Sequence, residues 1–324
     1  MTNAPSAPRG RAGTGFFSRP YLILTLTSLF WGGNVVAGKL AVGHVDAHSL
    51  MILRWTGALL VILPFAVGKL RQDWPVLKRK WWLYLFYGAA GYATFNVFVY
   101  FAAYHTSGVN SALEQVSVNI FVLLLNFTLF RLRISVGELV GVVITILGVA
   151  VIATHGELSR ILALEVNIGD AMVVFACFAY AIYSVCLRWR PKTHWLSFLA
   201  ASFTGAILAS FGYQSVLGEG LSALPTALAA IDLQGWLVVA YTVFFPSIIS
   251  QMLFVRGVEL IGSNRASLFV NLIPLFGTIG SVLILGESLQ LFHIAAALLI
   301  AAGIVLAEWS ARKAKGRTQD ARPQ

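Results

Sequence analysis

Ten apolar runs of roughly membrane-spanning length limit the folds open to this 324-residue chain. A helix needs about 20 residues to cross about 30 Å of hydrocarbon. The chain is 58% hydrophobic and 11% charged, whereas about a quarter of a typical soluble domain is charged, so lipid must solvate most of its surface. We predict transmembrane helices over residues 21–41, 48–68, 82–104, 108–130, 136–153, 168–187, 195–215, 234–256, 263–285 and 290–308.

The basic residues support this number of helices, because cytoplasmic loops retain Lys and Arg. With the amino terminus inside, most of the 23 Lys and Arg residues fall in inner segments, and outer loops carry mainly Asp and Glu. The pattern predicts an inner (plasma) membrane protein with both termini in the cytoplasm. Residues 1–19 are expected to form a disordered cytoplasmic tail, and residues 310–324 a basic one.

The second half of the chain repeats the first. An offset of 154 residues aligns Tyr87 with Tyr241, Gly108 with Gly262, and Asn110 with Asn264. Because five helices are an odd number, the second copy must enter the membrane from the opposite face. The predicted fold is therefore an all-α membrane protein with ten transmembrane helices in two inverted five-helix repeats, residues 20–155 and 166–309. Such repeats build alternating-access carriers, whose site lies near the midplane. A duplicated scaffold or channel is the alternative.

Several stretches are similar to a known family: SLFWGGNVVAGKLA, LMILRW and YHTSGVNSAL in the first half, and SLFVNLIPLFGTIGSVLILGES in the second. They resemble the EamA-type branch of the drug/metabolite transporter superfamily. The resemblance implies ten helices in two repeats, and transport of a small metabolite such as an amino acid, drug or sugar. The first repeat departs from the family pattern, with Ile120 opposite Pro274 and Arg131-Leu132 opposite Gly286-Glu287.

Two helices carry polar stripes, on which side chains a turn apart share one face. The stripes comprise Asn110, Glu114 and Ser117 in the fourth helix, and Asn264, Ser267 and Asn271 in the ninth. An ionisable group inside a membrane is a functional candidate by default. Glu114 is therefore predicted to bind an amine of the solute or to carry H+. The alternative is a structural ion pair with Lys39 or Arg54, which are themselves expected to reach the outer interface along their long stems.

Aromatic and amide side chains inside apolar runs form a second set of candidates. Small-molecule sites combine aromatic walls with few polar groups. The predicted solute-binding residues, besides Glu114, Ser117 and Asn271, are Trp31, Asn34, Tyr92, Asn96, Tyr180, Tyr183, Tyr241, Ser250 and Gln251. Interfacial anchoring is the alternative for the Trp and Tyr residues. Pro246 and Pro274 are candidate hinges, because a proline inside a helix frees a carbonyl one turn earlier.

Other chemistries lack the residues that they need. The sequence holds no HExxH, GxSxG or GxxxxGK[ST] motif, and no stripe of basic residues for nucleic acid. His44 and His48 are expected to be solvated at the interface rather than to bind a metal. No metal, cofactor or enzymatic activity is predicted. Gly137, Gly141, Ala297 and Ala301 have small-xxx-small spacing, which is expected to pack the two repeats together in a monomer or weak dimer.

The leading functional hypothesis is a secondary carrier for an amino acid or an amphipathic or aromatic compound. Export is implied by the family resemblance alone. A facilitative, channel-like permease and, less favoured, a membrane-embedded enzyme are the alternatives.

Overall fold

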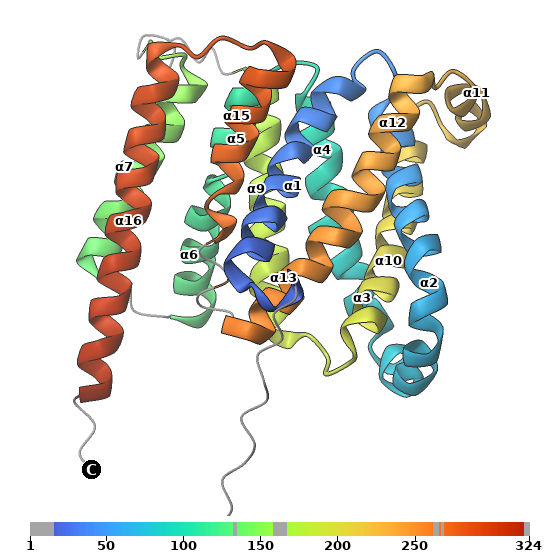
Figure 1. Cartoon of the computed structure of the whole chain (residues 1–324), viewed down its shortest axis with the longest axis horizontal. Coiled ribbons are helices and arrows are strands. Elements are labelled where there is room, and N and C mark those ends of the chain that lie inside the picture. Colours follow the sequence, from blue (N-terminus) through green and yellow to red (C-terminus); the bar gives the residue numbers. More distant parts are fainter. Residues whose placement is uncertain (1–15, 132–134, 158–166, 262–265, 267–268, 321–324) are drawn as a thin grey trace, which may run out of the picture.

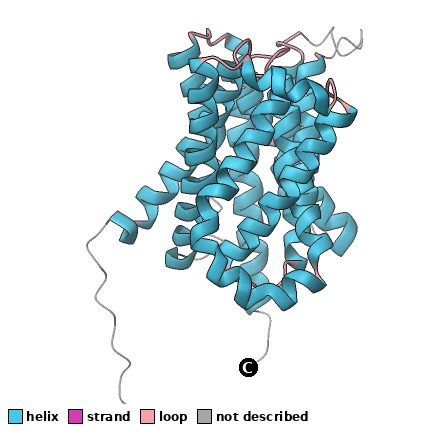
Figure 2. Cartoon of the chain, turned by 90° about the vertical axis from the view of Figure 1, so that its right-hand side faces the viewer, coloured by secondary structure: helices cyan, strands magenta, loops and turns pink. Residues whose placement is uncertain are grey.

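The computed structural model describes residues 16–131, 135–157, 167–261, 266 and 269–320. Within these residues every regular element is a helix, and the loops lie at the two ends of the bundle (Figures 1 and 2). The helix α1 begins and α16 ends on the same side, the lower side in Figure 1, which we call the termini side. The opposite end, which carries the connection from α1 to α2, is the far side.

The helices of the first half are short segments as well as long spans. They are α1 (Pro20–Ala41), α2 (Ala47–Arg79), α3 (Trp81–Tyr87), η2 (Gly88–Thr94), α4 (Phe95–Ala102), α5 (Gly108–Glu114), α6 (Ser117–Phe130) and α7 (Val136–Ala153), preceded by the short 3-10 turn η1 (Phe16–Ser18). Those of the second half are α9 (Ile168–Cys186), η3 (Leu187–Trp189), α10 (Trp195–Val216), η4 (Leu221–Ala223), α11 (Leu224–Ala229), α12 (Leu233–Thr242), η5 (Val243–Ile249), α13 (Ser250–Ile261), α15 (Ile273–Leu285) and α16 (Leu291–Asp320).

The apolar runs correspond to these helices. Seven helical stretches are long and apolar enough to cross a membrane: Pro20–Ala41, Ala47–Arg79, Trp81–Ala102, Gly108–Phe130, Ile168–Trp189, Trp195–Val216 and Leu233–Ile261. Three shorter apolar helices cover Val136–Ile152, Ile273–Leu285 and Leu291–Ala307. Large apolar side chains point outward along many of them, among them Leu283, Leu298 and Val305, each more than 60% exposed. These features make the chain a multi-pass, all-helical membrane protein.

The structure corrects two details of the predicted spans. Residues 108–130 form two helices, α5 and α6, with a turn at Gln115 and Val116 between them. Pro274 was expected inside a helix, but it lies in the first turn of α15, after a turn at Asn271. A proline in the first turn lacks an N–H that would have no intrahelical partner there, so it starts the helix and does not kink it. The other two polar residues of the ninth-helix stripe, Asn264 and Ser267, lie outside the described residues, as do 1–15 and 321–324 of the two tails.

Two π-helical segments occupy equivalent places in the two halves. Residues 88–94 form η2 between α3 and α4, and residues 243–249 form η5 between α12 and α13. When the two halves are aligned with the offset of 154 residues, η2 and η5 coincide to within one residue. Wide π turns leave backbone carbonyls with altered partners and often occur at functional sites. In η5, which contains Pro246, the Ser247 hydroxyl donates to the Thr242 carbonyl at 2.7 Å.

The helices α7 and α16 pack closely along one edge of the bundle (Figure 1). A Cβ added at Gly141 would lie 2.5 Å from the Gly303 carbonyl oxygen, so only glycine allows this approach. The prediction that Gly137 and Gly141 pack the two halves together is confirmed for α7. On α16, however, Gly303 makes the contact, and Ala301 is exposed. Ala297 packs against the buried cluster that contains Ile152 of α7, so of the two predicted alanines only Ala301 was placed wrongly.

The packing of α7 on α16 gives a stability prediction. Gly141→Ala should destabilise the protein by about 1–3 kcal/mol, because the added methyl meets backbone that cannot move aside. The measurement is thermal unfolding of the purified protein in detergent. Gly68→Ala in α2 is the matched control, since its new Cβ would meet nothing within 4 Å and should have little effect or be slightly stabilising. Equal unfolding temperatures for wild type and Gly141→Ala would contradict this packing.

Candidate solute-binding site

The most polar buried site surrounds Arg54, whose side chain is only 4% exposed. Its Nε donates to Ser247 Oγ at 2.8 Å, and its Nη1 donates to Asn34 Oδ1 at 2.9 Å and Asn96 Oδ1 at 2.7 Å. The Tyr100 hydroxyl also contacts Nη1 and itself donates to Asn34 Oδ1 at 3.0 Å. These residues come from α1, α2, α4 and η5, so both halves of the chain build the site.

The orientation of each amide in this site follows from its other partners. Asn96 Nδ2 donates to the Tyr92 carbonyl at 2.8 Å, which turns Asn96 Oδ1 toward Arg54. Asn34 Nδ2 donates to the same Oδ1 at 3.3 Å, leaving Asn34 Oδ1 for the guanidinium. All the acceptors around Arg54 are neutral, and no carboxylate of the described residues lies within salt-bridge distance of it.

An aromatic cluster adjoins Arg54 on one side. The guanidinium lies 4.6 Å from the centre of the Trp55 ring, a cation–π distance. The Trp55 ring packs against Tyr92 and Phe203, with centroids 5.1 and 5.2 Å apart. Tyr92 and Tyr183 bring their hydroxyl oxygens to 3.3 Å. The predicted residues Asn34, Tyr92, Asn96 and Tyr183 are thus in or beside one connected cluster, and Tyr180 extends it through a ring contact with Tyr183 at 5.2 Å.

A second buried polar group surrounds Glu114 in α5. The Glu114 side chain is fully buried, and neither carboxylate oxygen has a hydrogen-bond partner among the described residues. Asp170, at the start of α9, is close enough to interact with it electrostatically. Asp170 accepts from the Thr106 hydroxyl through Oδ1, whereas its Oδ2 is buried without a partner in the described part of the chain. Asn110 Oδ1 lies 3.0 Å from His293 Nε2, on α16.

The alternative interpretation of Glu114, an ion pair with Lys39 or Arg54, is not formed. Lys39 Nζ donates to the carbonyls of Ala103 and Thr106, at 2.8 and 3.0 Å, beyond the end of α4. Arg54 donates to the neutral side chains of Ser247, Asn34 and Asn96 instead. The expectation that Arg54 reaches the outer interface is also wrong, because depth along a helix does not fix the direction in which a side chain points. The prediction that His48 is solvated is also wrong, because His48 is only 6% exposed and packs on Phe101.

The remaining predicted residues lie at other contacts between helices. Trp31 Nε1 donates to the Pro246 carbonyl at 3.0 Å, which joins α1 to η5. Ser250 Oγ donates to the Thr27 carbonyl at 3.4 Å, and Asn119 Nδ2 donates to Asn271 Oδ1 at 3.2 Å. The structure does not place these side chains in contact with Arg54. Ser117 is buried and Gln251 half-buried.

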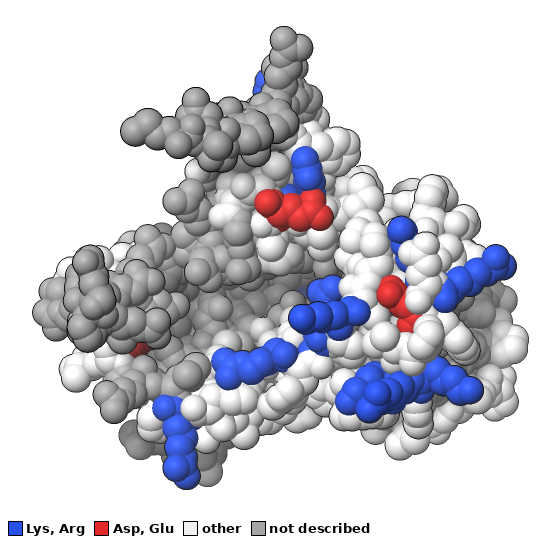
Figure 3. All heavy atoms as spheres, turned by 90° about the horizontal axis from the view of Figure 1, so that it is seen from below, with Lys and Arg blue, Asp and Glu red and all other residues white. Residues whose placement is uncertain are grey.

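Polar contacts join helices to one another on the far side. The Glu287 carboxylate, beyond α15, accepts from the Gly108 and Val109 N–H groups at 2.8 and 2.9 Å, so it caps the start of α5. His44 Nδ1 lies 2.6 Å from Asp232 Oδ2, which connects the end of α1 with the start of α12. Seen from the termini side, by contrast, the surface is hollowed near its centre, and Lys and Arg side chains border the hollow (Figure 3).

The far-side contact of Asp232 is maintained at neutral pH. The Gly235 N–H and then His44 hold the pKa of this carboxyl below its ordinary value. A carboxylate with a lowered pKa stabilises the folded state above its unfolded-state pKa, and this stabilisation is lost only as the pH falls through the folded-state value. Acidification is therefore needed to break this connection by protonating Asp232.

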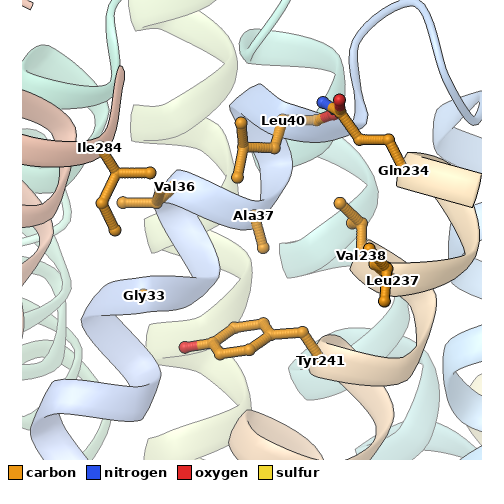
Figure 4. A pocket seen from close by; sticks show the side chains of 9 residues that line it. All are labelled: Gly33, Val36, Ala37, Leu40, Gln234, Leu237, Val238, Tyr241 and Ile284. Carbon is orange, nitrogen blue, oxygen red and sulfur yellow. The ribbon is translucent and has the colours of Figure 1, made fainter. Parts of the chain in front are cut away.

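One cavity in the described residues, of about 320 Å³, is not the polar site. It lies between α1, α12 and α15, and its walls are Gly33, Val36, Ala37, Leu40, Gln234, Leu237, Val238, Tyr241 and Ile284 (Figure 4). Leu237 is 63% exposed and Ile284 64% exposed, so the cavity opens at the lipid-facing perimeter. The Tyr241 hydroxyl donates to the Phe30 carbonyl at 3.1 Å. Of the predicted solute-binding residues, only Tyr241 lines this apolar groove.

Sequence reasoning missed Arg54 as part of a site, although a signal was present. Asn34, Arg54 and Asn96 each lie roughly 10 Å, by helical rise, from the far-side end of their helix. Three isolated polar side chains at one depth on three helices need common partners in an apolar bundle. Comparing depths, instead of judging each residue by itself, would have brought these residues together.

Known proteins resemble the chain over nearly its whole length. The EamA-like transporter family matches it twice, over residues 18–154 and 167–309. The uncharacterized transporter YyaM of Bacillus subtilis is 24% identical over 310 residues, covering 93% of this chain and 97% of that protein. A Salmonella typhimurium protein named "Probable amino-acid metabolite efflux pump" is 24% identical over 288 residues, 87% of this chain and 92% of that protein. One crystal structure shares the fold, with a TM-score of 0.60 and 18% identity over 91% of this chain and 98% of that chain.

The contact between Glu287 and α5 predicts a change in far-side access. Ser281 is fully buried, and a Cβ on Gly108 would lie 2.4 Å from its Oγ. In a background without Cys177 and Cys186, a cysteine at position 281 should react slowly with a membrane-impermeant maleimide. Adding Glu287→Gln removes the anionic cap, so labelling should become several-fold faster. Glu259→Gln, at an exposed ion pair with Arg256, is the control and should leave the rate unchanged. Equal rates in all three backgrounds would exclude a closing role for Glu287.

Proposed function

The chain belongs to the EamA-like transporter family, and on that premise we propose that it is a secondary transporter working by alternating access. Its solute is a small metabolite, either an amino acid or another amphipathic or aromatic compound. The observation that carries the proposal is the Arg54 site. A buried polar site between the two halves is what a carrier for a polar solute needs, whereas a scaffold has no use for a charge there.

Two inverted five-helix repeats underlie this mechanism. The π-helices η2 and η5 support the repeat, because they break the third helix of each half at places that align to within one residue under the 154-residue offset. The contacts agree as well: α1 packs on α13 in the way that α9 packs on α4. Arg131 and Gly286, which differ in type, both adopt left-handed backbone, with φ of 51° and 70°, at the ends of α6 and α15. The departure from the family pattern at Arg131 therefore preserves the local backbone.

The conformation of the bundle fits one state of the transport cycle. Glu287, Lys39 and the pair of His44 with Asp232 close the far side, and the termini side is hollowed (Figure 3). In this proposal the protein lies in the inner (plasma) membrane. All ten apolar helices cross the bilayer, and both termini are in the cytoplasm. The hollow then faces the cytoplasm, ready to receive a solute for export. The Salmonella relative's name supports both export and an amino-acid metabolite.

Glu114 provides coupling to H+. The Glu114 carboxylate is fully buried and has no hydrogen-bond partner in the described part of the chain, so it is costly when charged, and proton uptake favours the closed far side. Opening that side would admit water to Glu114 and Asp170 and let the proton leave. Asp170, whose Oδ2 is also buried without a partner among the described residues, places a second carboxyl group near Glu114.

Counterflow in proteoliposomes tests the proposed function. Vesicles containing the protein are loaded with an unlabelled mixture of the common amino acids, and each labelled amino acid is added outside in turn. A carrier should accumulate at least one label transiently and saturably, whereas empty vesicles should not. Uptake without saturation or counterflow would favour a channel-like permease. Chemical conversion of a solute without net movement across the sealed bilayer would favour a membrane enzyme.

Glu114→Gln should remove the pH dependence of transport, because glutamine cannot exchange a proton. The measurement is the initial rate of uptake into vesicles across a pH series. Glu259→Gln is the matched control, since Glu259 is an exposed carboxylate paired with Arg256 on the surface. A pH profile of Glu114→Gln identical to that of wild type would exclude Glu114 from any proton-carrying role.

A further inference from the structure

We propose that Arg54 binds the carboxylate of the transported solute, an inference that rests on the proposed function and specifies its substrate class. The charge of Arg54 has no counter-ion among the described residues of the site. A guanidinium remains protonated in any protein environment, and a charge inside a bilayer is normally paired. Here the partners are the two amides, a hydroxyl and a phenol, all neutral. The site therefore carries one positive charge that the described residues leave uncompensated.

The N–H donors of Arg54 are arranged to accept a carboxylate. Nη1 has two hydrogens but three oxygen neighbours, from Asn34, Asn96 and Tyr100, so one acceptor there is in excess. Nη2, in contrast, donates to no atom of the described residues, although it too has two hydrogens. A carboxylate that approaches this edge takes the free Nη2–H and replaces the surplus acceptor on Nη1. It thereby forms the two parallel bonds that arginine and carboxylates prefer.

The residues around the Arg54 guanidinium suit a solute with one carboxylate and an apolar body. Trp55 covers one face of the guanidinium at 4.6 Å, and Nε is held by Ser247, so the cation is fixed in orientation. Lys39 donates to the carbonyls of Ala103 and Thr106 and to no acceptor of the Arg54 site, so within the described residues Arg54 is the cation that contacts this site. One fixed charge suits a monocarboxylate, whereas a phosphate dianion would remain half uncompensated. The rings of Trp55, Tyr92 and Tyr183 suit an apolar or aromatic body on the same solute.

Three probes that differ only in their polar end group test the assignment on the full-length wild type in detergent. They are 3-phenylpropionate, 3-phenylpropanol and 3-phenylpropylamine, and phenyl phosphate is added as a dianion. Thermal unfolding as a function of probe concentration gives an apparent Kd for each. The carboxylate should bind at least about tenfold more tightly than the alcohol and the amine. Equal or tighter binding of the amine, the alcohol or phenyl phosphate, or no effect of the carboxylate, would overturn the proposal.

Variants then locate the effect. Arg54→Lys keeps the charge but loses the planar fork, so carboxylate binding should weaken about tenfold; Arg54→Gln should abolish it. Arg188→Gln is the control, because Arg188 is exposed and lies over the Phe130 ring at 3.8 Å, outside the site. Unchanged carboxylate binding in Arg54→Gln would overturn the proposal. If that variant does not fold, the wild-type probe series and Arg54→Lys still decide.

The failure of this inference is distinguishable from failure of the proposed function. Counterflow of an amine or a neutral solute, together with no carboxylate binding, would leave the carrier intact and remove only the role of Arg54. Absence of counterflow for every solute would remove the carrier itself.

Discussion

A permanent positive charge held inside an apolar helix bundle is the constraint on which the rest of this structure depends. A central charge costs about 2.5–3.5 kcal/mol even on permissive insertion scales, so Arg54 requires partners from several helices at one depth. Asn34, Asn96 and Ser247 are those partners, and they tie α1, α2 and α4 of the first half to η5 of the second. The requirement to solvate one side chain thus fixes how the two halves meet.

The two π-helices position side chains that contact Arg54. Ser247 reaches Arg54 from η5 while its own hydroxyl donates to the Thr242 carbonyl, so the wide turn places a side chain between the two halves of the protein. In the first half, Asn96 is the second residue after η2, and its Nδ2 donates to the Tyr92 carbonyl. Backbone irregularity is tolerated within a membrane only where protein or water satisfies it. The polar site and the irregular helices therefore support each other, and neither needs contact with lipid.

Much of the fold could be predicted from the sequence, because apolar length and the distribution of charge report on the bilayer directly. Residues 136–153 are helical as predicted, whereas α2 continues to Arg79, well beyond the apolar run that was used to define it. The site was predicted less well. Glu114 was correctly singled out as deeply buried, and Asn34 and Asn96 as polar groups within the bundle, but Arg54 was assigned to the interface. Hydropathy indicates how deep a residue lies in the membrane, whereas a binding site depends on the direction in which each side chain points. That direction is set by packing between helices that are far apart in the sequence.

In the proposed carrier, two oppositely oriented halves enclose the Arg54 site. His105 and Glu259 are equivalent residues under the 154-residue offset, and both are exposed. The most direct measurement is labelling of a single cysteine at each position with an impermeant thiol reagent, added to intact cells or to inside-out vesicles. The account predicts that His105→Cys reacts only from outside the cell and Glu259→Cys only from the cytoplasm. Reaction of both from the same side would contradict it.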